Sequence, residues 1–287
     1  MWRRSCSAKK RKVEPLPASK LKIATWNINS VRLRMPLVAQ FVESHAPDVL
    51  CLQETKCRDA EFPLRDFYAL GYKHVLINGQ KGYHGVAVAS KTPMRLIEKR
   101  DFCEKGDARH IAVELETPTG AIALHNFYVP AGGDEPDRDI NPKFAHKLDF
   151  LDEMREWSRK EKIAAGRAVL VGDLNIAPLE QDVWSHKALL KVVSHTPIEV
   201  EKLNAFFAAG EWIDAMRHFV PAEEKLYTWW SYRAADWAAS DRGRRLDHIL
   251  VSPALGGALS RLDVLKEARG WTRPSDHVPA MIEISVR

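Results

Sequence analysis

The chain of 287 residues lacks several features that would assign a protein to a broad class at once. No apolar run approaches the roughly 20 residues that a membrane helix needs. No apolar stretch follows the charged N-terminus, as it would in a secretory signal. The four cysteines form no CxxC pair and have no histidines at zinc-finger spacing. These absences predict a protein without membrane spans in a reducing, cytoplasmic compartment, associated with the nucleoid if the source is bacterial.

The net charge of +5 is concentrated at the N-terminus. Residues 1–20 contain seven Lys or Arg and one acid, Glu14, whereas the other 36 basic and 37 acidic residues give a net charge of −1. We therefore expect a disordered basic arm over residues 1–20 and a single domain over 21–287. Residues 8–13 resemble a nuclear-import patch, but a non-specific DNA-binding arm or an incidental extension is the favoured interpretation.

Hydrophobic periodicity predicts strands that alternate with helices along the whole body. Continuous or alternating apolar runs predict strands at 23–28, 49–52, 86–89, 111–115, 122–128, 168–171, 246–251 and 281–286. Apolar residues at helical spacing predict a helix that opens at Pro36 and a longer one over 143–162, with two short helices in the polar middle. This pattern indicates the α/β class, with a sheet-on-sheet core and outer helices.

Polar residues of catalytic type recur at the ends of these predicted strands. On their own, such residues are usually turns, surface loops or helix caps. Six in one chain favour a common site, because strand ends converge on one edge in α/β proteins. The six segments are Trp26-Asn27-Ile28-Asn29, Gln53-Glu54-Thr55-Lys56, Tyr128-Val129-Pro130, Gly172-Asp173-Leu174-Asn175, Arg245-Leu246-Asp247 and Ser275-Asp276-His277-Val278-Pro279.

This ordered set resembles the exonuclease III / abasic-site (AP) endonuclease family of the endonuclease/exonuclease/phosphatase superfamily. The resemblance covers residues 21–287, and the segments 53–56 and 227–233 are its more specific parts. It implies a four-layered α/β sandwich, with two packed sheets flanked by helices as in DNase I. It also implies a monomeric phosphodiesterase of base-excision repair that uses Mg²⁺ and tolerates Mn²⁺. Its substrate would be double-stranded DNA, incised 5′ to abasic sites or trimmed at blocked or recessed 3′ ends.

The resemblance also assigns a metal-binding group. Glu54 becomes the metal ligand, with Asp276 and Asn29 nearby as ligands that bind directly or through water. Carboxylate and amide oxygens suit a hard divalent cation. The alternative for Glu54 is a surface acid that pairs with Lys56, which is itself a candidate DNA contact.

A second group would act on the attacking water and the phosphate. Asp173 would orient or deprotonate the water, and Asn175 would hold Asp173 in place. His277 would donate to the phosphate while Asp247 fixes its tautomer. Whether Asp173 or the His277–Asp247 pair is the base stays open. Tyr128 would also contact the phosphate.

The remaining candidates concern DNA and the pocket. Asn27 would bridge the phosphate and Asp173. Arg109 is either a DNA contact or a solvated arginine at a strand edge. Trp229 and Leu246 match positions that form the wall of a pocket for a flipped abasic sugar. The core is the simpler place for four other tryptophans, Trp26, Trp157, Trp212 and Trp230.

Two positions depart from the family pattern. Ala131 stands where relatives carry Asn or Gln, so one polar DNA contact is missing or comes from the loop 132–138. Arg244 stands where relatives place Trp or Leu at the pocket wall, and it would stack on a ring or grip a phosphate. Both departures affect the balance between abasic-site incision and 3′→5′ exonuclease activity.

Two alternative classes are weighed against this interpretation. A lipid or inositol-phosphate phosphatase, a sphingomyelinase or a secreted DNase I-like nuclease would share the Asp-x-Asn and Ser-Asp-His motifs. Lys56 and the segment around Trp229 disfavour the lipid-directed enzymes, and the missing secretory signal disfavours the secreted nuclease. A catalytically silent DNA-binding protein would show no EDTA-sensitive cleavage, and its DNA affinity would not respond to Glu54→Ala.

Overall fold

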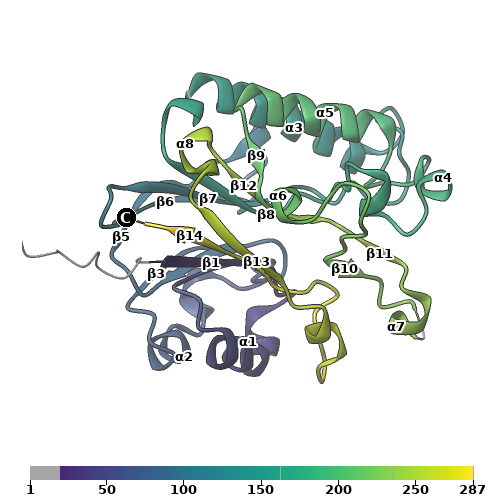
Figure 1. Cartoon of the computed structure of the whole chain (residues 1–287). Coiled ribbons are helices and arrows are strands. Elements are labelled where there is room, and N and C mark those ends of the chain that lie inside the picture. Colours follow the sequence, from purple (N-terminus) through teal and green to yellow (C-terminus); the bar gives the residue numbers. More distant parts are fainter. Residues whose placement is uncertain (1–19, 162, 235, 287) are drawn as a thin grey trace, which may run out of the picture.

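A computed structural model describes residues 20–161, 163–234 and 236–286. The expected basic arm therefore lies outside the described residues, except for Lys20 at the start of the first strand. The described chain contains two six-stranded sheets and one two-stranded sheet. Figure 1 shows the two large sheets stacked on each other, with α1 and α2 on one outer side and α3 and α5 on the other. These four layers confirm the predicted sandwich.

Each large sheet places one parallel pair of strands among antiparallel neighbours. The first sheet has the order β13(Leu259–Val264), β14(Ala280–Ser285), β1(Lys20–Asn27), β2(Val49–Gln53), β4(Val86–Ser90) and β3(His74–Asn78). The second sheet has the order β5(Met94–Glu98), β6(His110–Leu115), β7(Ile122–Tyr128), β8(Ala168–Asp173), β12(Asp247–Val251) and β9(Ile213–Asp214). The parallel pairs are β1 with β2 and β7 with β8.

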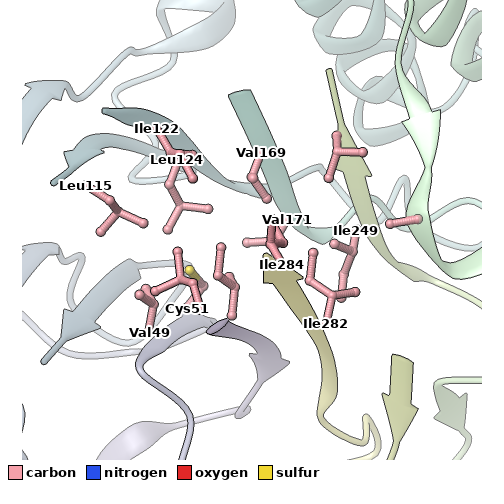
Figure 2. Packing of buried hydrophobic residues seen from close by; sticks show 14 of the residues in the cluster. Val49, Cys51, Leu115, Ile122, Leu124, Val169, Val171, Ile249, Ile282 and Ile284 are labelled. Carbon is pink, nitrogen blue, oxygen red and sulfur yellow. The ribbon is translucent and has the colours of Figure 1, made fainter. Parts of the chain in front are cut away.

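The core between the two sheets follows from the two-residue period of each strand. In β1, Ile23 points into the space between the sheets, whereas Trp26 packs on the helical side. In β8, Val169 and Val171 face the other sheet, and Leu170 faces the helices over the second sheet. Figure 2 shows the inner side chains of both sheets meeting in one apolar layer. The four tryptophans assigned to the core, Trp26, Trp157, Trp212 and Trp230, are all buried.

A buried pair of amides joins the two sheets. Gln53 Nε2, on β2, donates to Asn126 Oδ1, on β7, at 2.7 Å. Asn126 Nδ2 in turn donates to the backbone oxygens of Leu52 and Ala87, each at 3.0 Å. Because both side chains are fully buried, these bonds satisfy groups that would otherwise be costly to desolvate.

The first helix differs from its prediction. α1(Val31–His45) begins five residues before Pro36, which therefore lies inside the helix and does not open it. Arg34 has φ −114° and interrupts the helical geometry just before this proline. Pro36 has no N–H to donate and its ring crowds the preceding turn, so the helix tolerates it at a kink. In the first turn, Val31 and Leu33 alternate with Arg32 and Arg34, so the apolar residues there lack the helical spacing on which the prediction was based.

The other long helices cover the second sheet. α3(Pro142–Lys160) lies within two residues of its predicted bounds, and its cap residue Asn141 accepts a hydrogen bond from the N–H of Lys143. α5(Pro197–Ala209) packs beside α3, and it is longer than the short helices expected there. The remaining helices are α2(Leu64–Ala69), α4(His186–Leu189), α6(Ala215–Phe219), α7(Trp237–Ser240), α8(Pro253–Gly256), and the 3₁₀ turns Asp59–Glu61, Phe102–Glu104, Ile163–Ala165, Glu180–Asp182 and Lys266–Gly270.

The strand ends that carry the polar motifs meet at one edge of the sandwich. Asn27 pairs with Gln53 across β1 and β2, and Tyr128 pairs with Asp173 across β7 and β8. Asp247 begins β12 directly opposite Asp173. The small hairpin β10(Trp229–Trp230) and β11(Gly243–Arg244) lies beyond the sheets, together with α7 at the right of Figure 1. No helix in the described ranges is long and apolar enough to cross a membrane.

Candidate active site

Glu54 lies directly after β2 and is held by three donors. Its Oε1 accepts from Asn27 Nδ2 and from the hydroxyl of Tyr128, each at 2.9 Å. Its Oε2 lies 2.7 Å from Lys56 Nζ. Burial favours the neutral acid, but Lys56 and Asn27 outweigh it and lower the pKa of Glu54. Glu54 and Lys56 both have positive φ, a conformation that costs energy in residues with a Cβ and is often found at functional sites.

Asn29 links Glu54 to the second predicted metal ligand, Asp276. Lys56 Nζ donates to Asn29 Oδ1 at 2.6 Å, and Asn29 Nδ2 donates to Asp276 Oδ1 at 3.2 Å. The other Asp276 oxygen accepts from Trp229 Nε1 at 3.0 Å. The Lys56 ammonium thus occupies a place between oxygens of Glu54 and Asn29. A cation is stabilised there, and the donors are the hard oxygens that Mg²⁺ prefers. The residues fit a divalent ion.

Asp173, His277 and Asp247 form a buried line beside Glu54. His277 Nδ1 lies 2.8 Å from Asp247 Oδ2, and its Nε2 lies 3.6 Å from Asp173 Oδ2. Asn27 Nδ2 also donates to Asp173 Oδ2 at 2.9 Å, so one amide group bridges the carboxylates of Asp173 and Glu54. The ligand atoms of the three residues lie within 4.8 Å of one another. The Nδ1–Asp247 hydrogen bond is the pairing between Asp247 and the His277 ring that the sequence analysis expected.

The pKa values of His277 and Asp173 are both raised, but for different reasons. Burial would lower the pKa of His277, but the carboxylates of Asp247 and Asp173 outweigh it and raise this pKa to about 10. Burial raises the pKa of Asp173 to about 7, although His277 opposes the shift. The imidazole is therefore cationic at neutral pH, whereas Asp173 is poised to exchange a proton there.

Asn175 and Gly172 hold Asp173 in position. The backbone N–H of Asn175 donates to Asp173 Oδ1 at 2.9 Å, and its side chain donates to Oδ2 at 3.2 Å. Asn175 also donates to the oxygen of Val129 at 2.9 Å, which ties this loop to the end of β7. Gly172 precedes Asp173 with φ 141°, and a Cβ there would collide with the carbonyl oxygen of Phe127.

A cavity of about 680 Å³ opens over these groups. Nine predicted site residues contribute to its lining: Glu54, Tyr128, Asp173, Asn175, Trp229, Arg244, Leu246, Asp276 and His277. Asn27 and Asp247 support the lining from behind through the hydrogen bonds described above. Trp229 and Leu246 thus share one cavity, as the pocket hypothesis requires. The guanidinium carbon of Arg244 lies 5.3 Å from the Trp229 ring centroid, so the arginine covers part of this wall.

Comparison with known proteins identifies the family. The profile of the Endonuclease/Exonuclease/phosphatase family matches residues 24–277. The chain belongs to this family.

Its relatives include exodeoxyribonuclease III of Haemophilus influenzae, with 31% identity over 271 residues that span 92% of this chain and 99% of the relative. An AP endonuclease from Archaeoglobus fulgidus has a TM-score of 0.84 and 32% identity, covering 91% of this chain and 98% of its own. A 3′ phosphatase from Neisseria, bound to a product DNA hairpin, has a TM-score of 0.83 and 32% identity, covering 92% of this chain and 99% of its own. These relatives confirm the resemblance to exonuclease III and AP endonucleases.

Arg109 is placed differently from the other predicted DNA contacts of this endonuclease/exonuclease/phosphatase chain. It is buried, and its Nε donates to Asp107 at 2.9 Å. Its guanidinium lies 4.9 Å from the Tyr128 ring centroid and donates to the Tyr128 backbone oxygen at 3.3 Å. Arg109 therefore supports Tyr128, and a direct DNA contact stays a prediction. Ala131 lines the cavity, as a position near the substrate should.

Two supporting residues of this family member escaped the sequence analysis. Thr228 Oγ1 accepts from the N–H groups of Leu246 and Asp247, each at 3.1 Å, and so fixes the start of β12. Lys147 Nζ is fully buried, pairs with Glu199 at 2.5 Å, and donates to the Asn175 backbone oxygen at 2.8 Å. Lys147 lies on the apolar stripe of α3, and a charged residue there is the signal that would have found it.

Proposed function

We propose that this protein is a divalent-metal-dependent DNA phosphodiesterase of base-excision repair that incises 5′ to abasic sites and trims 3′ ends. The observation that carries the proposal is the Asn27 side chain, which donates at 2.9 Å to both Glu54 and Asp173. It holds the carboxylate that would bind the metal beside a carboxylate with a pKa of about 7. Phosphodiester hydrolysis needs both, together with a cation for the developing charge.

Glu54, Asp276 and Asn29 would hold the metal. Once bound, Mg²⁺ would neutralise charge on the phosphate oxygens and the leaving 3′-oxygen, and Mn²⁺ would serve as well because it accepts similar oxygen ligands. Lys56 would then leave its place between Glu54 and Asn29 and become free to contact the DNA backbone.

The protonation states support Asp173 as the base. His277 has a pKa of about 10, so it carries a proton at neutral pH and cannot take another. It is suited to donate Nε2–H to a phosphate oxygen, with Asp247 fixing the ring from the other side. Asp173, with a pKa of about 7, can accept the proton of the attacking water. Tyr128 stays protonated, because burial raises its pKa, and it can donate its hydroxyl to the phosphate.

The substrate assignment rests on the cavity and on the relatives. Trp229 and Leu246 offer apolar surface beside the catalytic groups, which suits a sugar without a base. The relatives named above comprise an exonuclease, an AP endonuclease and a 3′ phosphatase bound to DNA. We propose action as a monomer on double-stranded DNA.

A paired cleavage assay tests this function. A duplex with one abasic-site analogue and an undamaged 3′-recessed duplex are incubated with the protein in Mg²⁺, in Mn²⁺ and in EDTA. We expect cleavage of both DNAs in either metal, none in EDTA, and a strong loss in Glu54→Ala. Glu114→Ala, which removes an acid paired with Arg95 outside the site, should behave as wild type. Metal-independent cleavage, or no cleavage of either DNA, would refute the proposal.

A further inference from the structure

The cavity extends beyond the wall formed by Trp229 and Leu246. Its lining runs from Asp173 and His277 at the catalytic end to Arg242 and Trp184, two residues that have no role in the proposed chemistry. Its volume of about 680 Å³ lies within the roughly 300–1,000 Å³ typical of pockets that bury whole drug-sized ligands. A sugar without a base would therefore leave much of the space beyond Trp229 unfilled.

Trp184 is fixed in this outer part by backbone and apolar contacts. Its N–H donates to the Gly243 oxygen at 3.1 Å, and the preceding Val183 forms a bridge with Arg244. The Trp184 side chain packs on the same apolar cluster as Trp229. The two indoles thus belong to one continuous wall.

Arg242 lies over the ring of Trp184. Its guanidinium carbon lies 4.7 Å from the Trp184 ring centroid. Arg242 is exposed, and among the described residues it has no carboxylate within ion-pair distance. Asp241 beside it pairs with Lys266 instead. We call this pair the Trp184–Arg242 platform. A guanidinium over an indole and without a counter-ion combines two groups on which nucleobases stack, an aromatic ring and an arginine.

We infer that the Trp184–Arg242 platform is the subsite for the nucleobase of a 3′-terminal nucleotide. This inference rests on the proposed function and deepens it. With the scissile phosphate over Asp173 and His277, the terminal sugar lies against Trp229 and Leu246, and its base reaches the platform. The cavity therefore admits an intact nucleotide as well as an abasic sugar, and the platform governs how well undamaged 3′ ends compete with abasic ones.

Two matched substrates isolate the contribution of the terminal nucleobase to kcat/KM. Both are the same labelled 3′-recessed duplex, and only the terminal residue differs: one carries a normal nucleotide and the other its tetrahydrofuran analogue without a base. The quantity measured is the ratio of kcat/KM for the normal end to kcat/KM for the end without a base. In Arg242→Ala and Trp184→Ala we expect this ratio to fall about tenfold, mainly through KM, because stacking of one base is lost. Trp184→Phe should retain most of the ratio.

Arg155→Ala serves as the charge control, since Arg155 is an exposed arginine of α3 paired with Glu156. Its ratio should equal that of wild type. Exposed Arg242 can be replaced without disturbing the core, so its variant stays informative even if Trp184→Ala fails to fold. An unchanged ratio would overturn the base subsite alone. It would result if kcat/KM fell equally on both ends, as expected if Arg242 contacts the DNA backbone, or if it did not change on either end. A wild-type protein that cleaves neither end would overturn the proposed function with it.

Discussion

Asp247 Oδ2 lies 2.8 Å from His277 Nδ1, and both side chains are buried. The pair begins on β12 and ends on the segment before β14, so it joins the second sheet to the first. Asp247 is the carboxylate that most strongly favours the imidazolium of His277. The contact therefore favours the positive charge on the imidazole that, in the proposed mechanism, faces the phosphate.

Asp247→Asn should weaken catalysis by removing this charge. We expect kcat for abasic-site cleavage to fall by about 100-fold, the usual order for loss of a group that stabilises transition-state charge. The His277→Ala change should cost a similar factor, and the double variant little more, because the two residues act as one unit. Single-turnover rates of the three variants check this. Additive losses would show that Asp247 acts independently of His277.

Asp173→Asn should abolish most turnover without impairing DNA binding. Asparagine keeps the hydrogen bond to the Asn175 N–H but cannot accept the proton of water, so kcat should fall by roughly 10²–10⁴. Fluorescence anisotropy with labelled abasic duplex, in the absence of metal, should give nearly the wild-type Kd. Incision at a near-normal rate would exclude Asp173 as the base.

Glu54→Gln should raise the metal requirement. The amide retains the size of the side chain but removes a negative charge from the ligand set, so the Mg²⁺ concentration for half-maximal activity should rise by about tenfold or more. A titration of the cleavage rate against Mg²⁺ concentration measures this half-maximal concentration. The same titration with Glu114→Gln provides a control for loss of an acid elsewhere. Overlapping curves for Glu54→Gln and wild type would remove Glu54 from the metal site.

Acid should destabilise the fold through buried neutral histidines. Burial, and then the nearby Arg245, lower the pKa of His248 to about 4. The unfolded chain, with a histidine pKa of about 6.5, thus binds the proton first as pH falls. The contribution of His248 is complete above pH 6.5 and is lost between pH 6.5 and 4, amounting to about 2 kcal/mol by pH 5. Between pH 7 and pH 5, the free energy of unfolding measured with urea should fall less in His248→Gln than in wild type. An equal fall would contradict the assignment.

Deletion of residues 1–20 tests the basic arm, which apart from Lys20 lies outside the described residues. The arm holds seven basic residues, and phosphate contacts release counter-ions, so its loss should reduce the slope of log Kd against log salt on undamaged duplex. Incision rates at saturating DNA should stay close to wild type. A salt slope identical to that of the full chain would show that the arm takes no part in binding.

Local patterns predicted the α/β sheet-on-sheet core and the polar strand ends, and the family resemblance added the four layers and the nine site residues that line the cavity. Buried strands such as β2 and β8 are continuously apolar, and each ends in a polar motif that the edge of the sheet brings together. The edge strands β3, β5 and β13 were missed because they are only partly buried and lack a clean apolar pattern.

Long-range partners could not be read from the sequence. The burial of Arg109 depends on Asp107 and Tyr128, and the charge of Lys147 is compensated by Glu199, 52 positions away. The Trp184–Arg242 stack likewise joins residues 58 positions apart in the chain. Such contacts arise from packing, whereas sequence periodicity reports only which face of an element is buried.

The hydrogen bond from Gln53 to Asn126 fixes the spacing between the two sheets near the site. Glu54 directly follows β2, which carries Gln53, and Tyr128 is the last residue of β7, which carries Asn126. The proposed catalytic residues are thus divided between the two sheets, and the distance between the sheets sets the distance between the two groups. A larger side chain in the apolar layer between the sheets would therefore lower the rate of hydrolysis without contacting any reacting atom. Neither half of the chain expressed alone would be an enzyme.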